Sequence, residues 1–218
     1  DEQKGRATGV RVIDANTKEM VEYFARIIFV NAACLNTNLV LLNSTSSRSP
    51  NGLGNDNGLL GKYVTFHNYR GTVTASFEGY EDSYYYGRRP TAIMMPSFRN
   101  VHKQEEDFMR GYMTFYSVGR ASTRIDTIGA ELKEAVSKPG IWNVHMMMQG
   151  ETIPIESNHV RLSTDQKDAW GIPQLITSVD YTDNDEKVLA DFLTQAEEML
   201  HTAGCSNITP RDSKQAPG

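Results

Sequence analysis

Residues 149–173 read QGETIPIESNHVRLSTDQKDAWGIP, and this polar stretch joins two apolar segments that we expect to be strands. Pro154, Gly171 and Pro173 lie within it, and residues of this kind punctuate a chain between regular elements. The stretch therefore predicts that the chain leaves one strand, turns through polar residues and returns as another strand.

The segment before this stretch, residues 141–149, alternates between apolar and more polar side chains with the period of a strand. The core-facing side would consist of Trp142, Val144, Met146 and Met148. The opposite side carries His145, Met147 and Gln149, and Glu151 follows at the same spacing. We expect these four residues to line a substrate cavity, although a solvent-exposed strand end would show the same alternation.

The segment after the stretch, Gln174–Asp180, predicts a strand, and a long helix follows from about Asn184 to Ala203. The buried stripe of that helix would consist of Val188, Phe192, Ala196, Met199 and Ala203. Asp183 and Glu186 have the spacing of a capping box, and Gly204 is a typical C-terminal stop.

The N-terminal part predicts a hairpin of residues 8–14 and 22–30, whose second strand ends in the apolar run Ile27-Ile-Phe-Val30. That run indicates burial on both faces. The small residues Asn31–Cys34 lead into a helix in which Leu35, Leu39 and Leu42 recur at helical spacing. Small residues at a helix start let a nucleotide approach the backbone amides, but close packing of a strand on a helix needs them as well.

Residues 44–61 are rich in Ser, Asn and Gly and predict a loop that we take as a domain boundary. Strands are predicted at residues 63–67, 71–77, 91–95 and 111–117, and a short helix at 127–137 with Ile128, Leu132 and Val136 on one face. Tyr84–Tyr86 could form a sugar-stacking platform or simply pack on the sheet. Residues 205–218 are polar with two prolines, so we expect a loose tail.

Composition excludes several classes of function. The chain has 218 residues and a net charge of -5, without a dense run of Lys or Arg, which argues against nucleic-acid binding. No apolar run approaches the roughly 20 residues of a membrane helix. Cys34 and Cys205 lie far apart, which suits two buried thiols or one long-range disulfide. No metal-ligand spacing of histidines is present, so we expect no metal site.

The succession of Thr8–Asp14, Ile28–Ala33 and a helix over Leu35–Ser44, then Asn57-Gly-Leu-Leu-Gly-Lys-Tyr63 and His67, resembles the middle of a known family. Asn158–Ser163, Asp168–Pro173 and a helix ending in Ala203-Gly204 are similar to its C-terminal substrate domain. This is the glucose-methanol-choline (GMC) family of flavin oxidoreductases. The resemblance covers residues 8–204 and rests on the order and spacing of individually loose motifs.

The resemblance implies an α+β fold in which an antiparallel sheet, with helices packed on one side, follows a hairpin and helix of an incomplete FAD-binding domain. Residues 1–45 would belong to the FAD domain, 46–204 to the substrate domain and 205–218 to the tail. The cofactor would be FAD, with Asn31, Ala32, Ala33 and Asn36 near its nucleotide half. The substrate would be an alcohol or sugar that transfers a hydride from its CH–OH group to the flavin.

The chain departs from the family at both ends. The Gly-x-Gly-x-x-Gly flavin fingerprint belongs before its first residue, and the catalytic His with its His or Asn partner belongs after the long helix. None of His67, His102, His145, His159 and His201 matches that catalytic position, so no catalytic residue is assigned.

We therefore expect a processed or trimmed fragment that alone neither retains FAD nor oxidises an alcohol, and whose partner is the remainder of the FAD domain. Two alternatives stay open. One is an autonomous antiparallel-sheet carbohydrate-binding module that uses Tyr84–Tyr86 and Trp170. The other is one subunit of a split enzyme.

Overall fold

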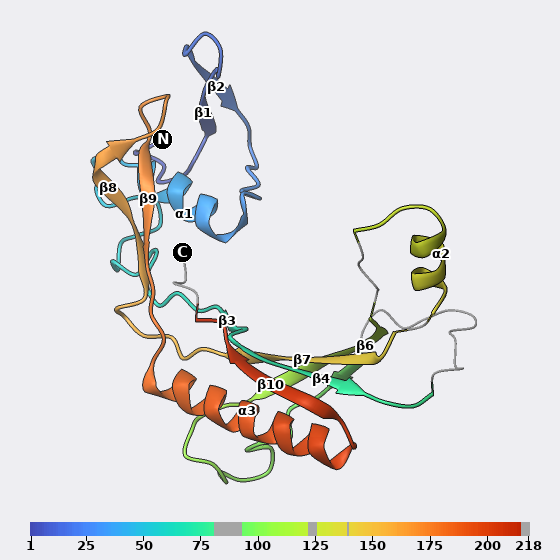
Figure 1. Ribbon diagram of the computed structural model, residues 1–218. Helices are drawn as coiled ribbons and strands as arrows, with labels where there is room; N and C mark the ends of the chain where they lie inside the picture. The colour runs from blue at the N-terminus through green and yellow to red at the C-terminus, as the bar shows by residue number, and fades with distance from the viewer. Residues whose placement is uncertain (81–92, 122–125, 139, 215–218) are drawn as a thin grey trace. The chain divides into compact units, whose positions relative to one another are not determined.

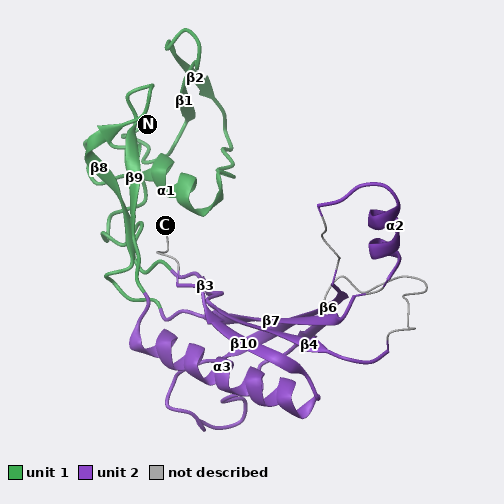
Figure 2. Cartoon of the chain, viewed as in Figure 1, with its two compact units in different colours: residues 1–64, 154–180, 218 green, residues 65–153, 181–217 purple. Residues whose placement is uncertain are grey.

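The computed structural model describes residues 1–80, 93–121, 126–138 and 140–214. Within these ranges the fold is α+β, as expected, with three helices and antiparallel strand pairs (Figure 1). The chain forms two compact units (Figure 2): unit 1 contains residues 1–64 and 154–180, and unit 2 contains the described parts of 65–153 and 181–217. These bounds differ from the expected division at residue 45, which was drawn by function and stays a prediction.

Unit 2 is built on one antiparallel sheet with the strand order β10-β4-β7-β6-β5, and β3 also pairs with β7. The strands are β3 (His67–Asn68), β4 (Gly71–Phe77), β5 (Ile93–Met95), β6 (Tyr112–Arg120), β7 (Trp142–Glu151) and β10 (Ser206–Asp212). The long central strand β7 is the strand predicted from its alternation. It lies between β4 and β6, so its residues are flanked on both sides.

Helix α3 (Asp183–Thr202) covers one face of this sheet. Its buried stripe contains Val188, Phe192 and Ala196, as predicted, together with Leu200. These side chains form a core with residues of the sheet, among them Val73, Met146 and Met148. The capping box is formed by Thr182 and Asp185 and not by the predicted Asp183 and Glu186, because the Thr182 hydroxyl accepts from the Asp185 amide.

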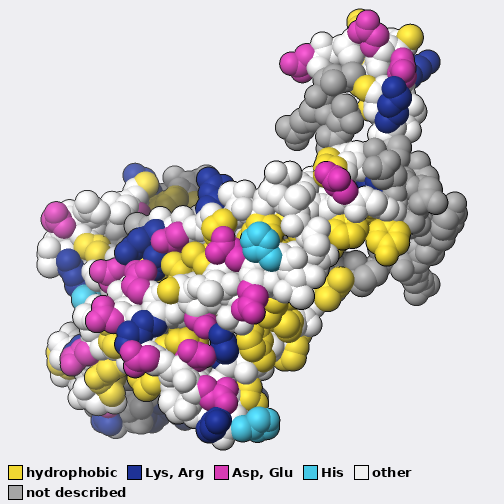
Figure 3. Space-filling model, turned by 60° about the horizontal axis from the view of Figure 1, so that its bottom comes forward, with side chains coloured by type: hydrophobic (Ala, Val, Ile, Leu, Met, Phe, Trp, Pro, Cys, Tyr) yellow, Lys and Arg dark blue, Asp and Glu magenta, His cyan; other side chains and the backbone are white. Residues whose placement is uncertain are grey.

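The surface on the α3 side carries charged side chains of both signs, interspersed with hydrophobic ones (Figure 3). Several of them form ion pairs between α3 and the loop before β6. Lys187 contacts Asp107 at 2.6 Å, and Arg99 contacts Asp191 at 2.7 Å. The mixture suits a solvated helix surface.

The prediction of a loose C-terminal tail is wrong for residues 206–212, which form β10 at the edge of the sheet. Two contacts explain why this segment forms a strand and not a loose tail. Ile208 packs against the hydrophobic core, and the Asp212 carboxylate pairs with Arg70 on the segment before β4. A polar composition therefore concealed an edge strand that pairs with β4 and is anchored by one apolar and one ionic contact.

Unit 1 contains the hairpin β1 (Gly9–Ile13) and β2 (Met20–Phe24), helix α1 (Ala33–Asn43) and a second antiparallel pair, β8 (His159–Lys167) and β9 (Pro173–Ser178). Helix α1 contacts β8 and β9. The loop of residues 44–61 lies within this unit. The prediction that residues 149–173 only turn between two strands is therefore wrong for His159–Lys167, which form β8 and pair with β9.

The apolar run Ile27–Val30, predicted as a buried strand end, lies outside β2, and Ile27 and Phe29 are 71% and 81% exposed. The physical reason is that β1 and β2 form a two-stranded sheet, and a lone hairpin has no second layer in which to bury such residues. The run therefore has the composition of a buried strand, but no second layer covers it in the described residues.

Two further predictions are wrong, one for helix α2 in unit 2 and one for Cys34 in unit 1. Helix α2 (Ala130–Ser137) forms, but its predicted apolar face is not buried, and Ile128 beside it is 88% exposed. Cys34 is exposed and Cys205 half-buried, both as free thiols, so the expectation of two buried thiols is wrong for Cys34. Tyr84–Tyr86 and the start of the strand predicted at residue 91 lie outside the described residues.

Candidate functional site

The face of the unit 2 sheet opposite α3 carries the candidate site, and we call it the open face. Along β7, Met146, Met148 and Gly150 are buried toward α3, so His145, Met147, Gln149 and Glu151 point to the other side. This confirms the predicted alternation. Whether these four residues bind substrate stays a prediction.

Cross-strand neighbours extend the open face on both sides of β7. His145 lies opposite Thr74 of β4 and Ser117 of β6, while Met147 lies opposite Thr72 and Phe115. Directly opposed residues in an antiparallel sheet project to the same side. The centre of the open face therefore combines hydroxyl groups with one histidine, a thioether and an aromatic ring.

The end of the open face near β3 is more polar. His67 lies opposite Glu151, and the Gln149 side-chain nitrogen lies 3.2 Å from Nδ1 and 3.3 Å from Nε2 of the His67 ring. The Glu151 carboxylate accepts a hydrogen bond of 2.8 Å from Arg110. Both members of that ion pair are more than half exposed, so water screens their attraction.

The structure adds His67, Tyr69 and Arg110 to the residues predicted for this face. The rings of His67 and Tyr69 lie 5.4 Å apart. The alternation of exposed His67 with buried Asn68 was a usable signal in the sequence, but a strand of two residues is too short for periodicity to show it.

Behind these outward side chains, Arg70 is almost fully buried and fixes the segment to α3 and β10. Its guanidinium donates to both carboxylate oxygens of Glu186, at 2.8 and 3.0 Å, and to both of Asp212, at 3.0 and 2.8 Å. It also lies over the ring of Tyr181, 4.5 Å from its centroid. Hydrogen bonds from Arg70 lower the pKa of the Glu186 and Asp212 carboxyls, and those bonds, against the opposing effect of burial, raise the pKa of Arg70.

The residues predicted to bind cofactor lie together at the start of α1 in unit 1. Asn31, Ala33 and Asn36 are exposed and Ala32 is half-buried. The helix has no side-chain cap, and Ala33 adopts a φ of +58°. The first amides of an uncapped helix have no intrahelical acceptor and suit an anionic group.

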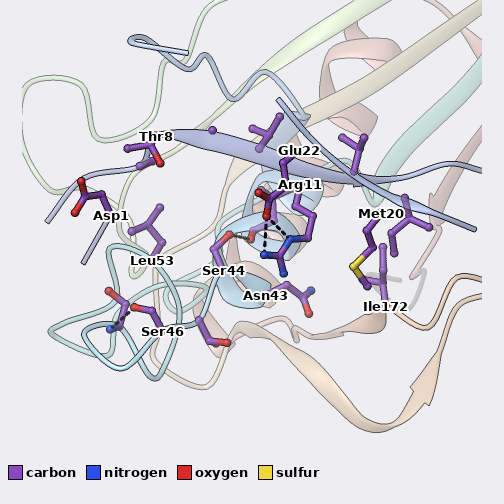
Figure 4. A pocket seen from close by; sticks show the side chains of 18 of the residues that line it. Asp1, Thr8, Arg11, Met20, Glu22, Asn43, Ser44, Ser46, Leu53 and Ile172 are labelled. Atoms are coloured by element: carbon purple, nitrogen blue, oxygen red, sulfur yellow. Dashed lines mark hydrogen bonds and ion pairs between the residues drawn. The ribbon is translucent and has the colours of Figure 1, made fainter. Parts of the chain in front are cut away.

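Unit 1 also contains a pocket of about 820 Å³ between the β1–β2 hairpin, the end of α1 and the turn before β9 (Figure 4). Arg11 and Glu22 form an ion pair of 2.7 Å on its wall. Its lining includes Val40 and Asn43 of α1 but none of the four predicted cofactor residues, so the structure does not bring those residues to this pocket. Trp170 also lines the pocket and donates from its indole nitrogen to the Ala15 carbonyl.

No cluster of three or more His, Cys, Asp or Glu side chains that could hold a metal ion is present among the described residues. In the same residues no helix combines the length and apolar character needed to cross a membrane.

Comparison with known proteins gives two relatives, and no protein-family model matches the chain. The chain is 30% identical over 200 residues to a 2-methyl-1,2-propanediol dehydrogenase of Mycolicibacterium austroafricanum, covering 84% of this chain and 34% of that protein. It is 25% identical over 175 residues to the fructose dehydrogenase large subunit of Gluconobacter japonicus, covering 78% and 31%. The chain thus spans about a third of the length of each relative, and both relatives are dehydrogenases.

Proposed function

We propose that this chain is the substrate-binding portion of an FAD-dependent GMC-type oxidoreductase that oxidises the CH–OH group of an alcohol or a sugar. The observation that carries the proposal is the similarity to two dehydrogenases, which covers 84% and 78% of the chain and so extends over both compact units. One relative is named for a small diol and the other for fructose, which favours a CH–OH substrate.

The open face supports the assignment of substrate binding to unit 2. His145, Met147, Gln149 and Glu151 stand on the central strand of a sheet whose other face is packed against α3. The backbone of such a strand is fixed before a ligand arrives, which favours orientation of a substrate. These residues would bind and orient the alcohol. The base that takes the hydroxyl proton is assigned to the rest of the parent enzyme.

The start of α1 supports the assignment of cofactor binding to unit 1. Asn31, Ala32 and Ala33 are small, and the amides that follow lack a side-chain cap, which fits the close approach of a phosphate. When bound, FAD supplies the acceptor for the hydride. Contacts to the nucleotide half of FAD are the part that we assign to this chain.

The exposed apolar residues of unit 1 support a partner for this unit. Phe24 is 73% exposed and Phe29 is 81% exposed, and such residues are normally covered by another layer of structure. We assign that layer to the remainder of the FAD domain. Because the fingerprint segment would be in that remainder, the chain alone would neither hold FAD tightly nor oxidise an alcohol.

Two measurements test the proposal. First, the chain is mixed with FAD and passed through gel filtration while flavin absorbance is followed; stoichiometric co-elution would contradict the incomplete site. Second, the full-length product of the parent gene is purified and its flavin spectrum recorded without oxygen while alcohols and sugars are added. Bleaching of the flavin band supports the proposal, whereas a parent protein without flavin refutes it.

A further inference from the structure

A local irregularity lies at the β3–β4 junction, directly after two rings that stand on the open face. Asn68 pairs with Gly150 and Thr72 with Met147, so the three residues 69–71 lie opposite only two residues of β7. An extra residue of this kind bends a strand and redirects its side chains, and such bulges are frequent beside active sites. His67 and Tyr69 alternate with the buried Asn68 and Arg70, and Tyr69 is 44% exposed beside His67. The extra residue leaves Arg70 and Gly71 both on the packed side.

The inward residues of the same segment hold this bulge in place. The Asn68 side chain is fully buried and donates to the Asp185 carbonyl at 3.4 Å, and Arg70 is fixed by its two carboxylate partners. At Gly71 a Cβ would lie 2.5 Å from the Phe192 ring, so the backbone is pressed against α3. The positions of His67 and Tyr69 are therefore set by the packed side of the unit.

The Gln149 side chain lies beside His67 but is not well aligned for a hydrogen bond with either ring nitrogen. Its amide nitrogen is almost equally far from both, and the two nitrogens flank a single ring carbon. An atom so placed does not lie along the lone pair of either nitrogen. Within the described residues the His67 ring makes no other hydrogen bond, so it can exchange one with a ligand hydroxyl.

The charge around these rings favours an uncharged ligand. Arg110 and Glu151, the ion pair at this end of the open face, are 2.8 Å apart and compensate each other. Behind the face, Arg70 is paired with Glu186 and Asp212. An exposed aromatic face next to a histidine and an amide matches a hydroxylated ring, which has a C–H face and equatorial hydroxyl groups. An open-chain diol of three or four carbons would leave most of the Tyr69 face uncovered.

We infer that His67, Tyr69 and Gln149 form a subsite for the ring of a neutral polyhydroxylated substrate, such as a pyranose or furanose. The inference rests on the proposed function for its biological meaning. The subsite stacks the ring on Tyr69 and offers His67 and Gln149 as hydrogen-bond partners for one hydroxyl. It distinguishes cyclic sugars from small diols.

The test is nuclear magnetic resonance of the isotopically labelled chain during titration with D-fructose and, separately, with 1,2-propanediol. Fructose is expected to shift the side-chain signals of His67, Tyr69 and Gln149, with binding weaker for the diol by about tenfold or more, equivalent to about 1.4 kcal/mol. Tyr69→Leu should abolish this preference, and Tyr69→Phe should retain it. Tyr63→Leu is the matched control, because Tyr63 is also 44% exposed.

His67→Gln provides a second variant should Tyr69→Leu disturb the fold; it should weaken fructose binding while leaving the Tyr69 signals in place. Equal binding of the two ligands, shifts located at Trp170, no shifts at all, or retained preference in Tyr69→Leu would each overturn the subsite. These outcomes leave the proposed function intact if the parent enzyme still shows substrate-dependent bleaching of its flavin. A parent without flavin would refute the proposed function whatever the titration gives.

Discussion

Unit 2 and unit 1 differ in where they keep their apolar side chains. In unit 2, residues such as Val73, Met148 and Phe192 are 0–1% exposed and form one core with α3. In unit 1 the one apolar side chain that falls in the buried class among the described residues is Val160, while Phe29 lies 81% exposed at the surface. The contrast teaches that the sheet of unit 2 carries its own stabilisation, and that unit 1 has the composition of a structure completed by another layer.

The largest expected effect is therefore a difference between two phenylalanines. Phe192→Ala should destabilise unit 2 by about 3–5 kcal/mol, because it removes a ring from a packed core. Phe29→Ala in unit 1 should change stability by less than about 0.5 kcal/mol. Each unit contains one tryptophan, Trp142 in unit 2 and Trp170 in unit 1, so Trp170→Phe and Trp142→Phe backgrounds let urea unfolding report each unit alone. Similar losses of unfolding free energy for Phe192→Ala and Phe29→Ala would contradict the proposed difference between the two units.

The second prediction contrasts an ion pair in each unit. The Arg70 side chain is 2% exposed, so Glu186→Gln combined with Asp212→Asn leaves a buried charge without a counter-charge and should cost about 3–5 kcal/mol. Arg70→Met should cost less, because its carboxylate partners are 45% and 39% exposed and stay hydrated. The control is Glu22→Gln in the exposed Arg11–Glu22 pair, with an expected cost of about 0–1 kcal/mol.

Urea unfolding in the Trp170→Phe background measures the first two variants, and the Trp142→Phe background measures the control. If Arg70→Met lowers the free energy of unfolding more than the double carboxylate variant does, desolvation of an unpaired guanidinium is not the main cause of the loss. That result would also weaken the view that Arg70 positions the bulge by being confined.

The third prediction follows from the lowered pKa of Glu186 and Asp212, which hydrogen bonds from Arg70 cause. A carboxyl with a lower pKa in the folded state stabilises that state fully above its ordinary pKa, near 4. The contribution is lost as pH falls from there through the lowered folded values. The stability difference between wild type and the double carboxylate variant should be constant near pH 7 and shrink below about pH 4. A difference that does not change with pH would contradict the assignment.

The sequence predicted the parts whose patterns are local and repeated. Strand β7 and helix α3 follow from period-2 and helical spacing over many residues, and Phe192 and Met148 lie where those patterns place them. Patterns without repeats failed. Strand β10 depends on Asp212 meeting Arg70, a pairing across 142 residues that no periodicity reveals.

The site was predictable to the same extent. The open-face residues His145, Met147 and Gln149 follow from the alternation of β7 alone. His67 and Tyr69 reach that face by alternating with the buried Asn68 and Arg70, but this alternation covers only four residues before the bulge at Arg70–Gly71 interrupts it. The prediction that Ile27–Val30 is buried was wrong for the opposite reason. The run is apolar enough for a buried strand, but no segment of the described residues covers Ile27 and Phe29.

A smaller effect is expected at the N-terminus of α3, where the two units differ again. Thr182 caps α3 with its hydroxyl and belongs to a capping box, so Thr182→Ala should cost about 1 kcal/mol in unit 2. Thr182→Ser is the matched control and should retain most of the stability. Urea unfolding in the Trp170→Phe background provides the measurement, and equal losses for Ala and Ser would argue against the capping bond.

The smallest effect concerns the uncapped start of α1. Ala32→Asp adds a carboxylate next to free amides and should stabilise α1 by roughly 0.5 kcal/mol in the isolated chain, because the negative charge favours a helix N-terminus. Slower hydrogen exchange of the α1 amides would show the gain. In the parent enzyme the same carboxylate would compete with a phosphate for those amides, so the flavin content should fall while the fold of α1 is retained. Ala32→Ser caps without adding charge, and unchanged flavin content in both variants would separate α1 from cofactor binding.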